Sequence, residues 1–559
     1  MAILPSMENP PYNRFMDLPH ETDANHLGRS RKYIEKVQQF CELVLEDGRD
    51  KYGEYSTPLF VDGLDVDTHE PVRWRVRNEK WTLSNFGNQQ ILLRTLVGLS
   101  QLTDNPRYLH AAEEATDYVF AHLRHGKLIS MGGHMAYDLE RKRPVFAPDK
   151  GPVHELKCHY PFYDLMWSVN SSETQDYIDA IWEGHILDWG RLEFSRHGTP
   201  SPASEGHRIW KQSYVGGDVF FVGRGLTFIN AGSDLIYAGA SLSRLSGDPR
   251  PLTWAKRLAD RYVQSRNPTT GLCGYQFSLS VLPGKNGRGD RAIAQFGEQL
   301  REHHPHEGNL CVTRQIRTIL GKSSINRMLL SEQVGEQAKP LLEAAVGDLL
   351  AYSEYAYDAE QNLLHPVLTD GHRLTGLVIE KSGYYGMQGD VLKAAKADFS
   401  ILWSYVLGYR LSREKRLWET ARWIAKGLKV GDIGELPGNP PALNLNETPN
   451  DSIALFAMIE LYKTTQAIEF LNYAEHIGDE IVLRSFHKGM YLYGQEFRYA
   501  KLDALEPLAL LHLTAHLRGT PDAIPLYWGS SAFFGSEYED QGHQIDNAVI
   551  YGQRNAKLH

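Results

Sequence analysis

The chain has 559 residues and a net charge of −10, with 42% hydrophobic and 23% charged residues. This composition is typical of a globular protein. The acidic balance argues against nucleic acid as the main partner, because no basic excess is present to neutralise phosphates. No stretch approaches 18 consecutive apolar residues, so the sequence predicts neither a transmembrane helix nor a membrane partner. The length allows several domains or one large ring of helices, and it gives no indication of the oligomeric state.

The N-terminal segment MAILPSMENPPYNRF has no basic region followed by an apolar run, so it does not resemble a signal peptide. We therefore expect a cytoplasmic location, or a periplasmic one if a signal peptide has been removed. The four cysteines are scattered without a CxxC pair, and we interpret them as reduced thiols: Cys41, Cys158, Cys273 and Cys311.

One local pattern recurs along the chain. An apolar helical segment ends in a short turn rich in Asp, Gly and Pro, and a second helical segment follows. The pattern occurs at 102–109, 245–252, 411–417 and after the LALLHLTAHL segment at 508–517. Each case predicts an αα-hairpin. Because the spacing between the hairpins is irregular, an (α/α) barrel is favoured over a solenoid of short repeats.

Other segments are not expected to be helical. Residues 55–74 alternate apolar residues with turn signals, which indicates short strands or an ordered loop. Residues 432–450 are rich in Pro, Gly and Asn and predict a loop, and 521–559 is a candidate closing arm. No segment has the composition of a linker, so we predict a single domain over 1–559.

The region between 130 and 200 contains the residues most suited to chemistry. His134 follows two glycines, Glu155 opens the helix-like run ELKCHYPFYDLMW, and Arg196 and His197 precede a glycine. Two imidazoles and a carboxylate would form a metal site suited to Mn, Co, Ni, Fe or Zn. Such a set does not suit Ca²⁺, which prefers oxygen ligands.

Competing interpretations exist for these positions. A single histidine beside glycines is more often a hydrogen-bonding loop residue than a metal ligand. His154 adjoins Glu155, and His159 would share its helical face if the run were a helix. The HHPH cluster, with His303, His304 and His306, is better explained as a solvated loop.

The whole chain resembles polysaccharide lyase family 2, the bacterial pectate lyases that include exopolygalacturonate lyases. The resemblance lies in YSTPLFVDGLDVDTHEPVRW, in the hairpin around LTDNPRYLHAAEEATDYVFAHL, and in the spacing of the GGH, HE and RHG elements. The steps of 21 residues from His134 to Glu155 and 42 from Glu155 to His197 match the family pattern. The resemblance implies an (α/α)7 barrel with short β segments and a substrate groove.

The resemblance also implies the chemistry. In this family two histidines and a glutamate, here His134, His197 and Glu155, hold a divalent transition metal. Manganese is expected first, with nickel or cobalt as alternatives. The arginine before the second histidine, here Arg196, acts as the Brønsted base. The expected reaction is β-elimination of α-1,4-linked polygalacturonate to 4,5-unsaturated products, in which the charge developing beside the uronate carboxylate must be neutralised.

Some roles stay open at this stage. Guanidinium groups are normally fully protonated, so Arg196 could instead clamp a carboxylate while a metal-bound hydroxide or a lysine acts as base. Arg224 and Lys381 are the predicted substrate-binding cations, although surface charge or loop packing would also explain them. Since exolytic members tend to be cytoplasmic, we expect an exolyase.

Two further classes of function are considered. A glycoside hydrolase on the same barrel would need a pair of carboxylates, for which Asp188 with Glu193 or Asp234 could be proposed. A non-catalytic helical scaffold would leave the GGH and RHG loops dispensable. The chain lacks a phosphate-binding glycine loop and a Ser-His-Asp order, which argues against nucleotide and serine chemistry.

Overall fold

The computed structural model describes residues 23–76, 78–129, 134–146, 151–198, 208–280, 310–380, 382, 386–530, 537–538, 542–545 and 548–549. No helix within these ranges is both long enough and apolar enough to cross a membrane.

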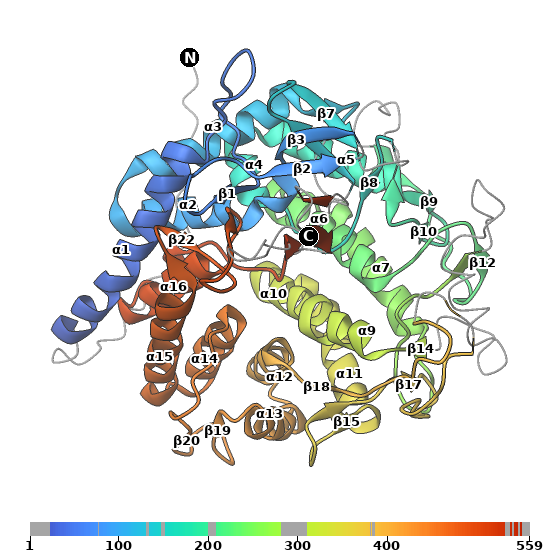
Figure 1. Cartoon of the computed structure of the whole chain (residues 1–559). Coiled ribbons are helices and arrows are strands. Elements are labelled where there is room, and N and C mark those ends of the chain that lie inside the picture. Colours follow the sequence, from blue (N-terminus) through green and yellow to red (C-terminus); the bar gives the residue numbers. More distant parts are fainter. Residues whose placement is uncertain are drawn as a thin grey trace, which may run out of the picture.

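Helical hairpins follow one another around a ring (Figure 1). In chain order the paired helices are α2 (Gln90–Thr103) with α3 (Pro106–His122), α4 (Tyr163–Val169) with α5 (Ser171–His185), α6 (Ile229–Ser246) with α7 (Pro249–Gln264), α9 (Thr313–Thr318), η4 (Ile319–Ser324) and α10 (Ile325–Val334) with α11 (Lys339–Tyr355), α12 (Phe399–Ser412) with α13 (Lys415–Gly427), and α14 (Ser452–Thr465) with α15 (Ile468–Ser485). Short 3-10 turns are η1 (Phe86–Asn88), η2 (Arg208–Lys211), η5 (Glu336–Ala338) and η6 (Pro521–Ala523).

The turns inside the hairpins are built from the residues that the sequence pattern identifies. Helix α3 begins with Pro106, and the Asn105 side chain caps it by accepting the Arg107 N–H. Helix α7 begins in the same way, with Pro249 and the Asp248 cap. Local sequence therefore determines where each first helix ends and the second begins.

The last predicted hairpin differs from the structure. Within the described residues after it, helix α16 (Glu506–Leu517) is followed by the short η6 and by no second helix. Pro521 and Pro525 interrupt this segment and do not allow a long helix to continue. Helix α16 packs instead against α1 (Asp23–Asp47), so the two ends of the chain close the ring together.

The architecture is an (α/α) barrel, as predicted. Helices α6, α10, α12, α14, α16 and α2 form the inner wall, each packing against the next in that order, and α13 and α15 lie outside α12 and α14 (Figure 1). Inner helices are buried over most of their length, and outer helices such as α7 and α13 bury one face. The number of hairpins in the ring, seven in the resemblance, stays a prediction, as does the single domain.

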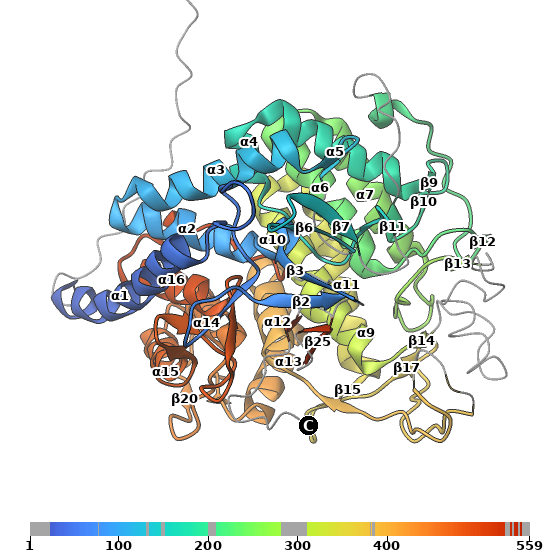
Figure 2. The same cartoon turned by 45° about the horizontal axis from the view of Figure 1, so that its top comes forward.

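Each inner helix that opens a hairpin ends at a short turn, so the longer connections between hairpins gather at the opposite end of the ring. Most β structure lies in these connections, as the tilted view shows (Figure 2). The largest sheet has the order β26-β25-β24-β2-β3-β6-β7, with β26 (Ala548–Val549), β25 (Gly542–Ile545), β24 (Glu537–Tyr538), β2 (Arg73–Val76), β3 (Glu79–Ser84), β6 (Met135–Asp138) and β7 (Arg143–Phe146).

The remaining strands are short. They pair as β1 (Gly63–Asp65) with β23 (Tyr499–Lys501), β4 (Arg124–His125) with β5 (Leu128–Ile129), β8 (His154–Glu155) with β11 (His197–Gly198), β9 (Ile186–Asp188) with β10 (Glu193–Phe194), β12 (Val222–Gly223) with β13 (Leu279–Ser280), β14 (Leu310–Cys311) with β17 (Val367–Leu368), β19 (Gly431–Asp432) with β20 (Ala442–Leu443) and β21 (Phe486–His487) with β22 (Met490–Tyr491), and as the sheet β15 (Tyr357–Asp358), β16 (Leu363–Leu364) and β18 (Ala395–Lys396). The short strands predicted within 55–74 are thus β1 and the first half of β2, and 432–450 is mainly loop, as predicted.

Three features complete the core. All four cysteines are buried free thiols, in agreement with the sequence. Tyr527 stacks on Phe456 of α14, and Trp528 lies against Tyr237 of α6, so the segment after η6 packs against the inner helices. The predicted role of 521–559 as a closing arm stays a prediction.

One buried ion-pair network joins neighbouring hairpins. Asp348 of α11 binds Arg327 of α10 at 2.7 Å and Arg266, just after α7, also at 2.7 Å. Burial alone would raise the pKa of Asp348, but the two guanidinium groups hold it below its usual value. The carboxylate therefore stays charged and links α7, α10 and α11.

We expect Asp348→Asn to lower the free energy of unfolding by about 3–5 kcal/mol, because two buried arginines lose their counter-charge. Urea unfolding followed by tryptophan fluorescence measures this change. The matched control is Glu354→Gln on the same helix, whose carboxylate pairs with Arg416 but is about half exposed, and which should cost about 0–1 kcal/mol. Equal small effects of the two substitutions would contradict a stabilising role for this network.

Candidate metal centre

Glu155 lies on a strand and not on a helix. Strand β8 pairs antiparallel with β11, which places Glu155 directly opposite His197 and His154 opposite Gly198. The helix expected from Glu155 onward begins only at Tyr163, so that expectation is wrong. The strand pair explains how residues 42 positions apart become neighbours, because facing residues of an antiparallel pair have adjacent side chains.

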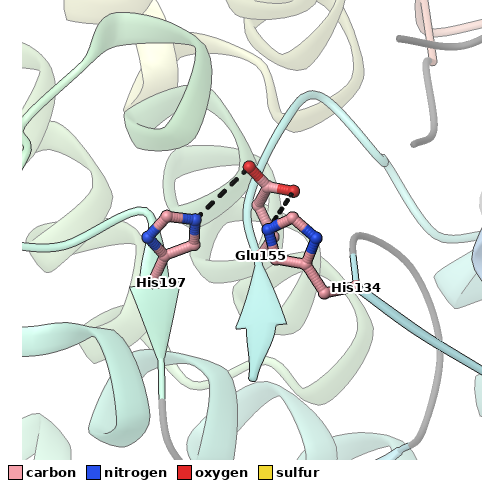
Figure 3. A group of neighbouring side chains, drawn as sticks. All are labelled: His134, Glu155 and His197. Atoms are coloured by element: carbon pink, nitrogen blue, oxygen red, sulfur yellow. Dashed lines mark ion pairs between the residues drawn. The ribbon is translucent and has the colours of Figure 1, made fainter. Parts of the chain in front are cut away.

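His134 reaches the same place from the large sheet. It directly precedes β6, whose register is fixed between β3 and β7, and its side chain is buried. Figure 3 shows the rings of His134 and His197 on either side of the Glu155 carboxylate.

The three side chains converge closely. His134 Nε2 lies 3.4 Å from Glu155 Oε2, and His197 Nε2 lies 3.5 Å from Glu155 Oε1. One ligand atom from each residue can be chosen so that all lie within 4.8 Å of one another. The structure therefore brings together the three residues that the sequence analysis selected as metal ligands.

The electrostatics of Glu155 suit a ligand. Its side chain is only 1% exposed, and burial would raise its pKa. Hydrogen bonding to His197 and the charges of Arg196 and His134 outweigh burial and hold the pKa of Glu155 well below its usual range. The carboxylate is therefore ionised at neutral pH, as metal coordination requires.

The donor set fits a first-row transition ion. Neighbouring donors around a cation bound at about 2.1 Å lie about 3.0–3.5 Å apart, and the two measured separations fall within that range. Glu155 Oε2 is buried and has no hydrogen-bond partner among the described residues, which leaves a charged oxygen directed at the space between the rings. Two imidazoles and one carboxylate leave coordination positions open for a substrate oxygen.

Arg196 lies at the edge of this site. Its Nε is 3.6 Å from Glu155 Oε1, and its side chain is 29% exposed, so a ligand in the solvent can reach it. The Arg196 carbonyl accepts the Leu156 N–H at 2.8 Å, which extends the pairing of β8 and β11 by one hydrogen bond. Strand pairing therefore positions both Arg196 and His197 beside Glu155.

The loop after Glu155 is held by side chains of the inner helices. Asp234 of α6 accepts the backbone N–H groups of Cys158 and His159 at 2.6 and 2.7 Å. Arg94 of α2 donates to the Tyr160 carbonyl at 3.0 Å. These bonds replace the helical hydrogen bonds that the segment lacks, and they hold Cys158 and Tyr160 at positive φ.

The competing histidines occupy different surroundings. His154 points to the other face of β8 and bonds to His185. His159 is buried near Asp234, and burial lowers its pKa to about 4. Glu155 is not on a helix, so the expectation that His159 would share its helical face is wrong. His303, His304 and His306 lie outside the described residues.

The structure describes one of the two predicted substrate-binding cations. Arg224 is exposed after β12, and its backbone N–H donates to Glu193 Oε1. Its role in binding substrate stays a prediction. Lys381 lies outside the described residues.

The carboxylates considered for a hydrolase have structural partners. Asp188 accepts the N–H of Gly190 at 2.8 Å, within the turn between β9 and β10. Glu193 accepts the N–H of Gly225 at 2.8 Å. Burial raises the pKa of Asp234 to about 7, as a general acid would need, but both of its oxygens hold the loop described above. The hydrolase alternative is not favoured.

Sequence analysis missed the residues that support the ligands. Asp234 was considered only as one carboxylate of a hydrolase pair, and His185, Tyr177 and Arg94 carried no local signal because their partners lie 23 to 143 positions away. The one available hint was the deeply apolar context of Arg94 within α2, since a charged residue there requires a specific partner.

Comparisons with known proteins identify the family of this chain. The sequence model described as periplasmic pectate lyase matches residues 57–537. The pectate disaccharide-lyase of Dickeya dadantii (strain 3937) is 29% identical over 546 residues, covering 94% of each chain.

Solved structures match this chain at low similarity. An α-mannanase of Bacteroides thetaiotaomicron matches with a TM-score of 0.42 and 12% identity, over 89% of this chain and 98% of that chain. An α-1,2-mannosidase of Trichoderma reesei matches with a TM-score of 0.46 and 9% identity, over 88% and 93%. These values carry no argument about function.

The fold and the family match define a polysaccharide lyase. The chain belongs to the periplasmic pectate lyase family, polysaccharide lyase family 2, and is a pectate-degrading lyase. The family description fits the periplasmic alternative of the two expected locations, and the cytoplasmic expectation stays a prediction.

We expect Glu155→Gln to weaken Mn²⁺ binding by at least ~100-fold, since loss of a ligand should exceed the ~10–100-fold effect of losing a supporting residue. Titration calorimetry on chelator-treated protein measures the affinity. Glu419→Gln, on the exposed face of α13, is the control and should bind as the parent protein does. Unchanged Mn²⁺ affinity in Glu155→Gln would place the metal elsewhere.

Proposed function

We propose that this chain is a metal-dependent pectate lyase that cleaves α-1,4-linked polygalacturonate or oligogalacturonides by β-elimination. The observation that carries the proposal is the convergence of His134, Glu155 and His197, with Arg196 beside them. The proposed cofactor is a divalent transition metal, first Mn²⁺, with Ni²⁺ or Co²⁺ as alternatives.

A divalent cation in this site supplies a Lewis acid for the uronate carboxylate, which acidifies the neighbouring C5 proton. His134 and His197 would each offer one imidazole nitrogen to the ion, and Glu155 would supply the anionic ligand. The pairing of β8 with β11 fixes the separation of Glu155 and His197 before substrate binds. This preorganisation is the main contribution of the protein to stabilising the developing charge.

Arg196 is the proposed Brønsted base that accepts the C5 proton before the C4–O4 bond breaks. Its support is its position: it adjoins His197, borders Glu155 and has a partly exposed side chain. The alternative role is a clamp on a substrate carboxylate, for which a guanidinium is well suited. Arg224 and Lys381 are the other proposed carboxylate-binding cations.

The proposed mode of cleavage is exolytic. The name of the relative in Dickeya dadantii, a pectate disaccharide-lyase, supports release of disaccharides from a chain end. An exolyase releases one short product from the first turnovers, whereas an endolyase yields a broad range of oligomers early.

Chelator-treated protein is expected to release no unsaturated product from polygalacturonate, and added Mn²⁺ should restore the release. Ultraviolet absorbance detects the new double bond, and chromatography over time gives the product sizes. Early disaccharide as the main product supports exolytic cleavage. Full activity after chelation would refute metal dependence, and product without ultraviolet absorbance would refute elimination.

We expect Arg196→Ala to lower kcat by about 10²–10⁴-fold, the usual contribution of a proton acceptor, while Mn²⁺ binding stays within a few-fold of the parent. Arg196→Lys separates the two roles. If Arg196 is the base, it must be deprotonated to act, so lysine should move the rise of kcat/KM with pH to lower pH, because its unperturbed pKa is about 10.4 against at least about 12.5 for arginine. A clamp predicts a raised KM with an unshifted profile.

A further inference from the structure

The strand pair that presents the ligands is very short. Strands β8 and β11 contain two residues each, and a ladder of this length gives little rigidity of its own. Successive side chains of a strand point to opposite faces, so Glu155 faces the ligand site and His154 faces away from it. The contacts of His154 on that far face therefore help to fix the position of β8 relative to β11.

His154 begins a chain of hydrogen bonds that returns to β11. Its Nδ1 lies 2.8 Å from Nε2 of His185, the last residue of α5. His185 Nδ1 lies 2.7 Å from the Ser195 carbonyl, two residues before His197. The Ser195 N–H donates to the His185 carbonyl at 3.0 Å. One histidine side chain thus connects the strand of Glu155 with the segment that leads to His197.

The donor and the acceptor of each hydrogen bond in this series follow from the chemistry of the groups. A carbonyl oxygen only accepts, so His185 Nδ1 carries the proton. Both rings are buried, which favours neutral imidazole, so His185 Nε2 is the acceptor and His154 Nδ1–H is the donor. His154 Nε2 is then an acceptor, and the Tyr177 hydroxyl lies 3.4 Å from it.

Gly198 completes the arrangement. A Cβ at this position would lie 2.5 Å from His185 Nε2, well inside contact distance, so only glycine lets the ring lie against β11. The glycine of the RHG element is therefore explained by the imidazole behind it, and not by a turn.

We propose that His185 and His154 are positioning residues that set the separation of the metal ligands Glu155 and His197. This inference rests on the proposed metal site and adds the support behind it. Neither histidine is a ligand in this arrangement, because the facing nitrogens of the two rings are occupied by each other and by the Ser195 carbonyl.

Two substitutions of His154 separate hydrogen bonding from packing. His154→Leu keeps a similar volume but has no donor, whereas His154→Asn is smaller but keeps an N–H near the position of Nδ1. We expect His154→Leu to weaken Mn²⁺ binding by about 10–100-fold and His154→Asn to stay within about 3-fold of the parent. Calorimetric titration of Mn²⁺ gives the affinities, and circular dichroism shows that each variant is folded.

Mn²⁺ affinity in His154→Leu equal to that of the parent would overturn the inference, as would an equal loss in the leucine and asparagine variants. If the proposed metal site itself is wrong, the result is different: Glu155→Gln would then leave the Mn²⁺ binding of the parent protein unchanged, or the parent protein would bind no Mn²⁺. If Mn²⁺ binding is lost in Glu155→Gln but unchanged in His154→Leu, only the positioning role is refuted.

A double-mutant cycle tests His185 directly. Gly198→Ala should weaken Mn²⁺ binding by pushing the His185 ring away, and His185→Ala should weaken it by removing the link. In the His185→Ala background, Gly198→Ala should have almost no further effect, because the ring that it contacts is gone. Strictly additive losses in affinity would show that Gly198 and His185 act independently, against the proposal.

Discussion

The buried carboxylate of Glu155 is the constraint on which the site depends. An ionised carboxylate that is 1% exposed is strongly unfavourable unless positive or hydrogen-bonding groups compensate it. His134, His197 and Arg196 provide that compensation, and each arrives from a connection between helices. Strand pairing, the loop anchored on Asp234 and the contact of His185 with β11 can all be understood as means of keeping these groups within 3.4 to 3.6 Å of one carboxylate.

The parts of the structure that the sequence predicts are those that local chemistry determines. The Asn105–Pro106 and Asp248–Pro249 turns end one helix and start the next with their own side chains, so the hairpins could be placed without tertiary information. The closure of the ring could not be predicted in this way. Helix α1 packs on α16 from the other end of the chain, and no local pattern indicates that a C-terminal helix will take its partner from the N-terminus.

The site shows the same division between local and distant determinants. The ligand types and their spacing could be predicted, because the family resemblance fixes them in sequence. The conformation around Glu155 could not, because ELKCHYPFYDLMW has apolar residues at helical spacing while its backbone hydrogen bonds go to Asp234 and Arg94, 60 to 80 positions away in most cases. A polar side chain buried in an inner helix can override local helix preference, since unsatisfied backbone groups cost more than propensity contributes.

Net charge gives an incomplete picture of what this protein can bind. The chain carries −10 overall, and a pectate substrate is itself a polyanion. Screening limits charge effects to about 8 Å at physiological salt, so the local sum matters more than the total. With a divalent cation bound, the charges of Glu155, Arg196 and the ion would sum to about +2 at one partly exposed site, and the burial of Glu155 strengthens the interactions of its charge. A uronate carboxylate therefore meets a positive site inside an acidic protein, and its attraction depends on the ligand geometry that β8 and β11 maintain.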